Sequence, residues 1–250
     1  MTLHSDLLQH KPFKEVIFEV LHQRILTGVY SSGEWLRQEE IASQMGVSMT
    51  PVREALDLLA ASGLAERVPY RGVRVVELSP RDIVEAYGMR LLLECFSVRQ
   101  AAVRISSSEL QHLENLLIGM DDCSCTKNLS RSRQLNREFH FSIVQAAANS
   151  LLLRMYTNVS NAFPDWMLYE AVFHHPELLA ESLVEENSEH RALLAALKDH
   201  DQDGAVRRAI DHILHIGRQL ELHLNIPAQD LRHQEQGIIP LLLPTRKEMP

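Results

Sequence analysis

The sequence has little positive charge and no long apolar run. The first counts against nucleic-acid binding and the second against a membrane-spanning helix. Its 250 residues contain 25 Lys and Arg against 33 Asp and Glu, for a formal net charge of −8. Binding to nucleic-acid phosphates needs a basic face, so the total charge taken alone counts against that function. No stretch approaches ~20 uninterrupted apolar residues, so no transmembrane helix and no membrane partner are expected. The first six residues lack a basic segment followed by an apolar run, and we expect no signal peptide.

Cysteine is also scarce. Cys95, Cys123 and Cys125 form an odd set without the spacing of a disulfide framework or a zinc ribbon, which favours a reducing, cytoplasmic location. Hydrophobic residues, in contrast, make up 45% of the chain. That content can build a substantial core, so global disorder is excluded, and the length indicates one large or two ordinary domains.

The chain has ten glycines and ten prolines, and many of them mark the ends of segments with helical or β-type periodicity. A helical pattern begins after Pro12 and ends near Gly28, and a second spans 38–45 before Gly46. A third begins with Ser48, Thr50 and Pro51 and runs to about Ser62. Two short β-type segments follow at 65–68 and 72–76, joined by a turn. Three helices and a two-stranded wing predict a winged helix-turn-helix domain over residues 1–78.

From Ser79 to about Asn225 the apolar residues show only helical periodicity. Ser79 can cap a helix whose first position is Pro80, and Asp82 favours the positive end of its dipole. The fold class is therefore mainly α, with an all-α antiparallel bundle of about six or seven helices over residues 79–225. Residues 226–250 contain four prolines and are expected to form an irregular C-terminal tail. The expected breaks within the bundle are 106–108, 121–127, 149–150, 163–165, 174–176 and 199–204.

The N-terminal pattern also carries the chemistry of duplex recognition. The second helix of a helix-turn-helix enters the major groove with its first residues at the base edges. The wing contains three arginines with no acidic residue between 67 and 74, and a glycine that permits a tight tip. A small helical domain with a solvated hairpin remains the alternative. The predicted DNA-binding residues are Arg37, Ser48, Met49, Thr50, Arg53, Arg67, Arg71, Gly72 and Arg74.

These motifs carry a resemblance. Residues 10–80 resemble the winged-helix domain of GntR-type bacterial transcription regulators, through segments 33–42, 47–56 and 63–64 and the pair Arg71-Gly72. The resemblance implies a palindromic double-stranded DNA operator, which a two-fold protein reads as a homodimer. In the family the residue between Ser48 and Thr50 is usually an arginine that contacts DNA. Met49 stands there in this chain and cannot hydrogen-bond to a base edge or a phosphate.

Three of the 13 histidines lie on inward, apolar faces of the predicted bundle. His140 follows Asn136 by one helical turn, His190 shares its face with leucines, and His212 lies between isoleucines. One inward histidine is usually a hydrogen-bonded core residue. Three of them on three helices also suit a shared metal site, since bundles place ligands on facing helices. His215, one turn after His212, is a reserve candidate.

Residues 80–225 are similar to the all-helical FCD-type ligand-binding domain of the FadR branch of the same family. The matching residues are Tyr87, Arg90 and Glu94, then Asn136, Phe139 and His140, then Glu189, His190 and His212. The resemblance implies that Asn136, in place of the commoner aspartate, binds a divalent metal ion together with His140, His190 and His212. Zinc or nickel suits such a set. It also implies a small organic-acid or sugar-acid effector, whose carboxylate Arg90 would bind; the alternative for Arg90 is an i,i+4 ion pair with Glu94.

The prediction for function is therefore a ligand-responsive, DNA-binding transcription regulator, not an enzyme. Its helical domain would bind a metal and a carboxylate effector that alters operator binding. One alternative is a metal-dependent enzyme. That alternative lacks a general base, because Glu138 and Glu189 are expected to point away from the ligands, and it leaves the winged helix unexplained. The other alternative is a structural helical dimer with core histidines.

Overall fold

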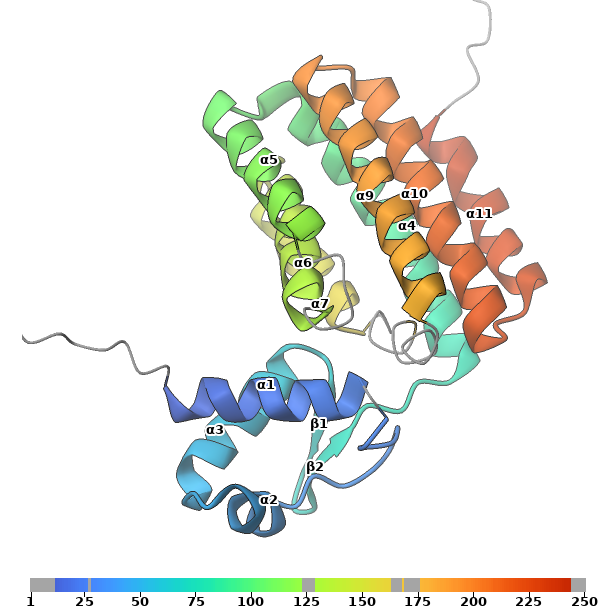
Figure 1. Cartoon of the computed structure of the whole chain (residues 1–250). Coiled ribbons are helices and arrows are strands. Elements are labelled where there is room, and N and C mark those ends of the chain that lie inside the picture. The colour runs from blue at the N-terminus through green and yellow to red at the C-terminus, as the bar shows by residue number, and fades with distance from the viewer. Residues whose placement is uncertain (1–11, 27, 123–128, 163–167, 169–175, 244–250) are drawn as a thin grey trace, which may run out of the picture. The chain divides into compact units, whose positions relative to one another are not determined.

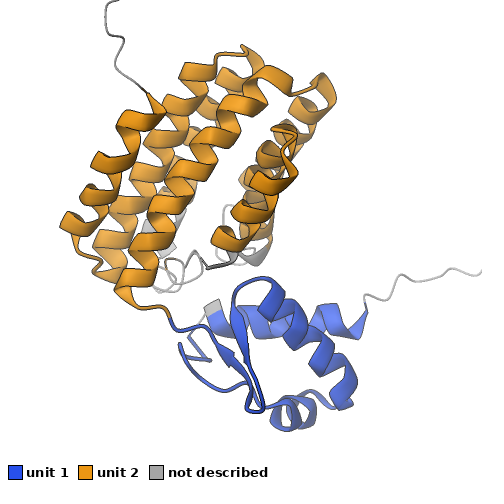
Figure 2. Cartoon of the chain, turned by 180° about the vertical axis from the view of Figure 1, so that it is seen from behind, with its two compact units in different colours: residues 1–77 blue, residues 78–250 orange. Residues whose placement is uncertain are grey.

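The computed structural model describes residues 12–26, 28–122, 129–162, 168 and 176–243. The chain divides into two compact units, Met1–Glu77 and Leu78–Pro250, which are coloured separately in Figure 2. Among the described residues, no helix combines the length and the apolar character that a membrane span requires.

The first unit is a winged helix, as predicted. Antiparallel β1 and β2 pair Ala65 with Val75 and Val68 with Gly72 (Figure 1). Gly46 ends α2 in the left-handed conformation, φ 66°, which glycine adopts without steric cost, and so directs the chain into α3. The elements are α1 (Phe13–Leu26), α2 (Gln38–Met45), α3 (Met49–Ala61), β1 (Ala65–Val68) and β2 (Gly72–Val75).

The second unit is all helical, and the predicted architecture is confirmed. The predicted cap of its first helix is present: the Asp82 amide donates to Ser79 Oγ, and the Ser79 amide donates to the Asp82 carboxylate at 2.9 Å. The seven helices described are α4 (Pro80–Arg104), α5 (Ser107–Asp122), α6 (Leu129–Ala146), α7 (Ser150–Ala162), α9 (Pro176–Lys198), α10 (Gln202–Leu224) and α11 (Ala228–Leu242).

The predicted breaks at 106–108, 149–150 and 199–204 coincide with the ends of these helices. Those at 121–127, 163–165 and 174–176 fall largely outside the described residues. Helix α4 lies at the centre, packed against α6, α7, α9, α10 and α11, so residues on this one helix can reach several neighbours (Figure 1).

The expectation of an irregular tail at 226–250 is wrong for most of that segment, because Ala228–Leu242 forms α11. The prolines do not prevent this helix: Pro227 precedes it and Pro240 falls in its last turn. Leu231 and Leu242 are buried in the main core, and the Tyr87 hydroxyl donates to Glu235 at 2.8 Å. Burial of an apolar face against α4 therefore outweighs the low local helix propensity.

Candidate functional site

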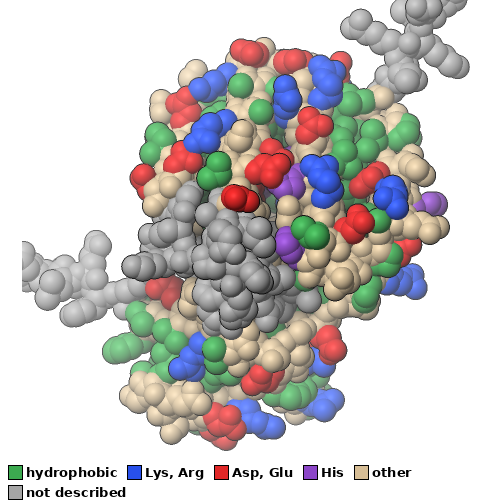
Figure 3. Space-filling view, turned by 45° about the vertical axis from the view of Figure 1, so that its right-hand side comes forward, with side chains coloured by type: hydrophobic (Ala, Val, Ile, Leu, Met, Phe, Trp, Pro, Cys, Tyr) green, Lys and Arg blue, Asp and Glu red, His purple; other side chains and the backbone are tan. Residues whose placement is uncertain are grey.

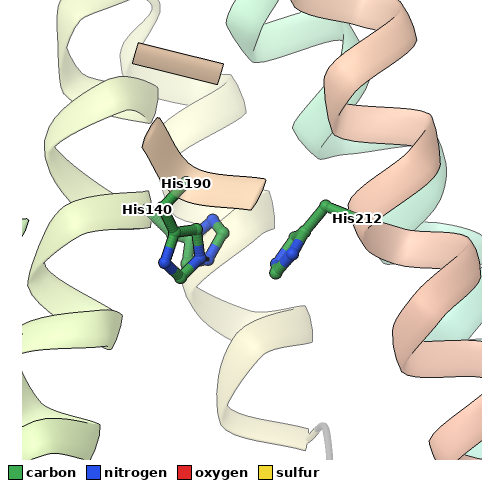
Figure 4. A group of neighbouring side chains, drawn as sticks. All are labelled: His140, His190 and His212. Carbon is green, nitrogen blue, oxygen red and sulfur yellow. Dashed lines mark hydrogen bonds between the residues drawn. The ribbon is translucent and has the colours of Figure 1, made fainter. Parts of the chain in front are cut away.

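His140, His190 and His212 meet in the interior of the helical unit. They come from α6, α9 and α10 respectively, and all three are buried. Figure 4 shows the imidazole rings facing one another, with ring centroids 4.8 to 5.1 Å apart. The His140 and His190 Nε2 atoms are 3.1 Å apart, and one nitrogen from each ring lies within 4.8 Å of the other two. The separate helical faces proposed from the sequence thus converge on one point.

Several polar atoms of this cluster have no partner in the protein. Among the described residues, Asn136 Oδ1 and His212 Nε2 are buried without a hydrogen bond. Asn136 lies one turn before His140 on α6. A buried polar atom without a partner costs about 1–3 kcal/mol, so these atoms call for a partner from outside the protein, such as an ion or a water molecule. Three imidazoles and one amide oxygen are donors that fit a divalent transition metal.

Two carboxylates lie behind the rings. Glu94 on α4 is 3.2 Å from His140 Nδ1, and Glu189 on α9 is 2.8 Å from His212 Nδ1. When Nδ1 of each ring donates to its carboxylate, the Nε2 lone pair points into the cluster, the arrangement common in metal-binding histidines. The sequence prediction that Glu189 points away from the ligands is wrong. His190, the next residue in the sequence, lies in the cluster from α9, but the partner of Glu189 is His212 on α10.

The protonation states also suit metal binding. Burial and the neighbouring His212 and His140 rings hold the pKa of His190 well below its usual value, so this imidazole is neutral. Burial raises the pKa of the Glu94 carboxyl, but the nearby Arg90 and His140 outweigh it and hold that pKa well below its usual range. A neutral imidazole at His190 and an ionised carboxylate at Glu94 are forms that favour the binding of a cation.

Arg90 lies beside this cluster. Its Nε donates to Glu94 at 2.6 Å in an ion pair whose two side chains are about 5% exposed. The i,i+4 pair weighed from the sequence is therefore present. Arg90 also lines the cavity next to the histidines, so a role in effector binding stays a prediction.

A small cavity adjoins the cluster. Its water-accessible volume is about 40 Å³, enough for a few water-sized atoms. His215 donates to Glu189 at 2.7 Å, and Gln219 donates to His215 at 2.9 Å. His215 thus lies in the cavity wall, outside the group of three rings. The lining includes Arg90, Asn136, Glu186, Glu189, His212 and His215.

The residues predicted to bind DNA gather at the start of α3 and on the wing of the first unit. Ser48, Met49, Thr50 and Arg53 are all exposed at the N-terminal end of α3, and Arg37 is exposed just before α2. The structure therefore presents the recognition-helix residues to solvent together.

The wing carries less free charge than its sequence suggests. Arg67 is bonded to Asp57 on α3, and Arg74 donates to Glu66 at 2.6 Å. Arg71 lies over the Trp35 ring at 5.1 Å, a cation–π contact, next to Gly72 with φ 115°. The absence of acidic residues between 67 and 74 did not reveal these ion pairs, because Asp57 and Glu66 lie outside that segment. On the face shown in Figure 3, basic and acidic side chains are likewise interspersed.

Tyr70 is a candidate contact residue that the sequence analysis did not select. It occupies the turn between β1 and β2, adopts a left-handed conformation with φ 62°, and its side chain is completely exposed. A bulky residue rarely takes this conformation, and large exposed aromatic rings often mark binding surfaces. The sequence did contain a signal for this residue: an aromatic side chain in the predicted turn between the two β-type segments, in a chain with only 6% aromatic residues.

A winged helix followed by a separate all-helical unit is the architecture of a class of DNA-binding regulators. The FCD domain family matches residues 85–215, and the family of bacterial regulatory proteins named gntR matches residues 13–75. The chain belongs to the GntR family, in its FCD-type, FadR-like branch. This family consists of transcription regulators and not of enzymes, which confirms the non-enzyme prediction.

Individual relatives agree with this assignment. The HTH-type transcriptional repressor RspR of Escherichia coli K12 is 28% identical over 222 residues, covering 88% of this chain and 94% of that protein. The gluconate operon transcriptional repressor of Bacillus licheniformis is 28% identical over 184 residues, covering 73% and 74%. The solved structure of E. coli McbR/YncC aligns with a TM-score of 0.65 at 22% identity, covering 84% of this chain and 98% of that one, which shows the shared fold.

Proposed function

We propose that this regulator binds a palindromic operator as a homodimer and that its helical unit holds a divalent metal ion and a small carboxylate effector. The observation that carries the ligand part is a cluster of three buried histidines, two of which contact a carboxylate through Nδ1. Two polar atoms of this cluster, Asn136 Oδ1 and His212 Nε2, have no hydrogen-bond partner in the described part of the protein. A purely structural core would satisfy those atoms within the protein.

His140, His190, His212 and Asn136 would hold the metal. Zinc or nickel suits three imidazoles, and the neutral amide of Asn136 adds no negative charge. The ion would supply positive charge and open coordination positions in the cavity. Since none of these four ligands is charged, an anionic effector compensates the ion better than a neutral one does.

The small volume of the cavity supports an effector whose metal-binding end is small. A volume of about 40 Å³ accepts a carboxylate and few further atoms. Arg90 lines that space and can add a charge-assisted hydrogen bond. A relative named for the gluconate operon agrees with an effector among the sugar acids or other small organic acids.

Helix α4 supplies a physical route from the effector to the DNA-binding domain. It follows the winged helix directly in the chain, and its Glu94 contacts His140. An effector that binds one arrangement of α4 and α6 more tightly shifts the population toward it, and α4 carries that change toward the winged helix.

The DNA part is tested by Arg53→Ala combined with Arg71→Ala. Duplexes are first selected from a random library on the wild-type chain, and the double variant is then titrated with the selected duplex at several salt concentrations. We expect affinity to fall at least about 100-fold and the salt dependence to become shallower by about two ions, because two cationic contacts are lost. Arg207→Ala with Arg208→Ala, two exposed arginines of α10, is the matched control and should bind as wild type. Equal affinity and an equal salt slope for Arg53→Ala/Arg71→Ala would contradict the proposed DNA surface.

The effector part is tested by thermal denaturation with a panel of organic and sugar acids, with and without a chelator. An effector present at 100 times its Kd stabilises the folded state by about 2.7 kcal/mol. We expect the hits to be carboxylates and their stabilisation to disappear when the metal is removed. A carboxylate that stabilises the chelated protein equally well would show that the metal is not part of the effector site.

A further inference from the structure

Met49 exposes an apolar side chain at the start of α3, the predicted recognition helix. It is the first residue of that helix and is 47% exposed. Among residues 30–57, all of which the structure describes, it is the one exposed large apolar side chain. Single apolar residues are common on protein surfaces, so the position of Met49 decides what its exposure means.

The packing of α3 fixes which of its side chains face solvent. The buried face of the helix consists of Val52, Ala55, Leu56 and Leu59. This face packs against α1, α2 and β1. Met49 lies outside it and one helical turn before the exposed Arg53, so these two side chains share the solvent-facing side of the helix. The fold therefore holds Met49 at the surface, beside an arginine proposed to contact DNA.

The residues on either side of Met49 are suited to phosphates. Ser48 and Thr50 carry hydroxyl groups, and the first turn of α3 contains no acidic residue that would repel DNA. The Ser48 side chain makes no capping hydrogen bond, although it stands at the capping position. Hydroxyls and the amides of a helix N-terminus typically bind phosphates, which position a protein without reading sequence. Met49 has no N–H or O–H group, so it can meet the groove only through apolar surface.

The major groove presents one apolar group that identifies a base, the methyl group of thymine, among hydrogen-bond donors and acceptors. A methionine side chain is flexible and polarisable, and it adapts to the shape of such a group. We infer that Met49 contacts a thymine methyl group in each half of the operator and thereby determines the base preferred at that position. The inference rests on the proposed function, because it requires that α3 enters the major groove of a palindromic duplex.

The first test removes only the methyl group and leaves the protein unchanged. Duplexes are selected from a random library on the wild-type chain, and each thymine of the selected half-site is replaced in turn by deoxyuridine, which lacks the methyl group. At one position the replacement should weaken binding about 4-fold per half-site, and about 15-fold in both halves, the effect expected for one buried methyl group at each. The salt dependence should not change, since no phosphate contact is lost.

The second test changes the protein. Met49→Ala should bind the thymine duplex at least about 4-fold per half-site more weakly, and should bind the thymine and deoxyuridine duplexes equally, because the methyl contact is already lost. Leu58→Ala, at an exposed apolar residue near the other end of the same helix, is the matched control and should keep the full response to deoxyuridine. Met49→Arg should select a G·C pair in place of the T·A pair, because arginine binds the guanine edge.

Several results would overturn the inference. These are a selected half-site without thymine, a wild-type affinity that no deoxyuridine changes, and a full deoxyuridine effect in Met49→Ala. Selection of the wild-type sequence by Met49→Arg would overturn it as well. Failure of the proposed function appears separately, because a wild-type chain that selects no duplex contradicts the proposed DNA binding and the inference together, whereas each of the other results contradicts the inference alone.

Discussion

Replacing His140 and His190 together with alanine is expected to lower bound divalent metal from about one ion per chain to less than about a tenth. The two Nε2 atoms are 3.1 Å apart at the centre of the cluster, so the double variant removes two of the four proposed ligands. The affinity should fall at least roughly a thousandfold, because His212 and Asn136 alone make a weak site. The protein is prepared without chelator and its metal content is measured by mass spectrometry.

Stability provides an independent measure of the same effect. Adding zinc should raise the Tm of the wild-type protein, because metal bound only to the folded state stabilises it by mass action, and should leave the Tm of His140→Ala/His190→Ala unchanged. His215→Ala is the matched control, since His215 is also buried and lines the same cavity but lies outside the three rings. Full metal content in the double variant would assign the ion to another group, such as Glu185, Glu189 and His215, whose donor atoms also lie close together.

Local periodicity was enough to select the three histidines. His140, His190 and His212 each share a helical face with apolar residues, and an inward face can be recognised without knowing what it packs against. Their meeting point depends on how α6, α9 and α10 pack. The sequence made convergence plausible, and the family resemblance supplied the ligand set.

The carboxylates behind the rings could not be found in this way. Glu189 is adjacent to His190 in the sequence, yet its bonds go to His212 and His215 on α10. Arg67 and Asp57 form a similar pair between a strand and a helix. Tertiary packing decides contacts of this kind. Counting charges along the wing therefore overestimates its free charge, and helical periodicity alone does not show which residue Glu189 contacts.

Helix α11 shows the same limit for secondary structure. Four prolines after residue 226 argued for an irregular tail, and local propensity is a weak guide when a segment can bury apolar residues. Leu231 and Leu242 do so against the core that α4 organises. The predicted winged helix needed no such information, because the glycines that end its helices, Pro51 near the start of α3 and its short β-type segments are all local signals.

Glu94→Gln should weaken both the fold and the proposed metal site. The substitution keeps the shape of the side chain but removes the negative charge that Glu94 presents to the buried Arg90 guanidinium, which should lower the free energy of unfolding by about 3 kcal/mol. It also removes the carboxylate that accepts from His140 Nδ1, and loss of such a partner typically lowers metal affinity about 10- to 100-fold. Urea denaturation without metal gives the first quantity and zinc titration the second.

Two further variants separate these effects. Glu85→Gln on the same helix removes an exposed i,i+4 pair with Arg81 and should change neither quantity measurably, because water screens exposed pairs. Arg90→Met combined with Glu94→Leu replaces the buried ion pair with apolar side chains and should recover much of the lost stability. It should not recover zinc affinity, because His140 still lacks its carboxylate. If Glu94→Gln were destabilised yet bound zinc as tightly as wild type, Glu94 would serve only to neutralise Arg90, and the orientation of His140 would have to come from packing against Phe139 and the neighbouring rings.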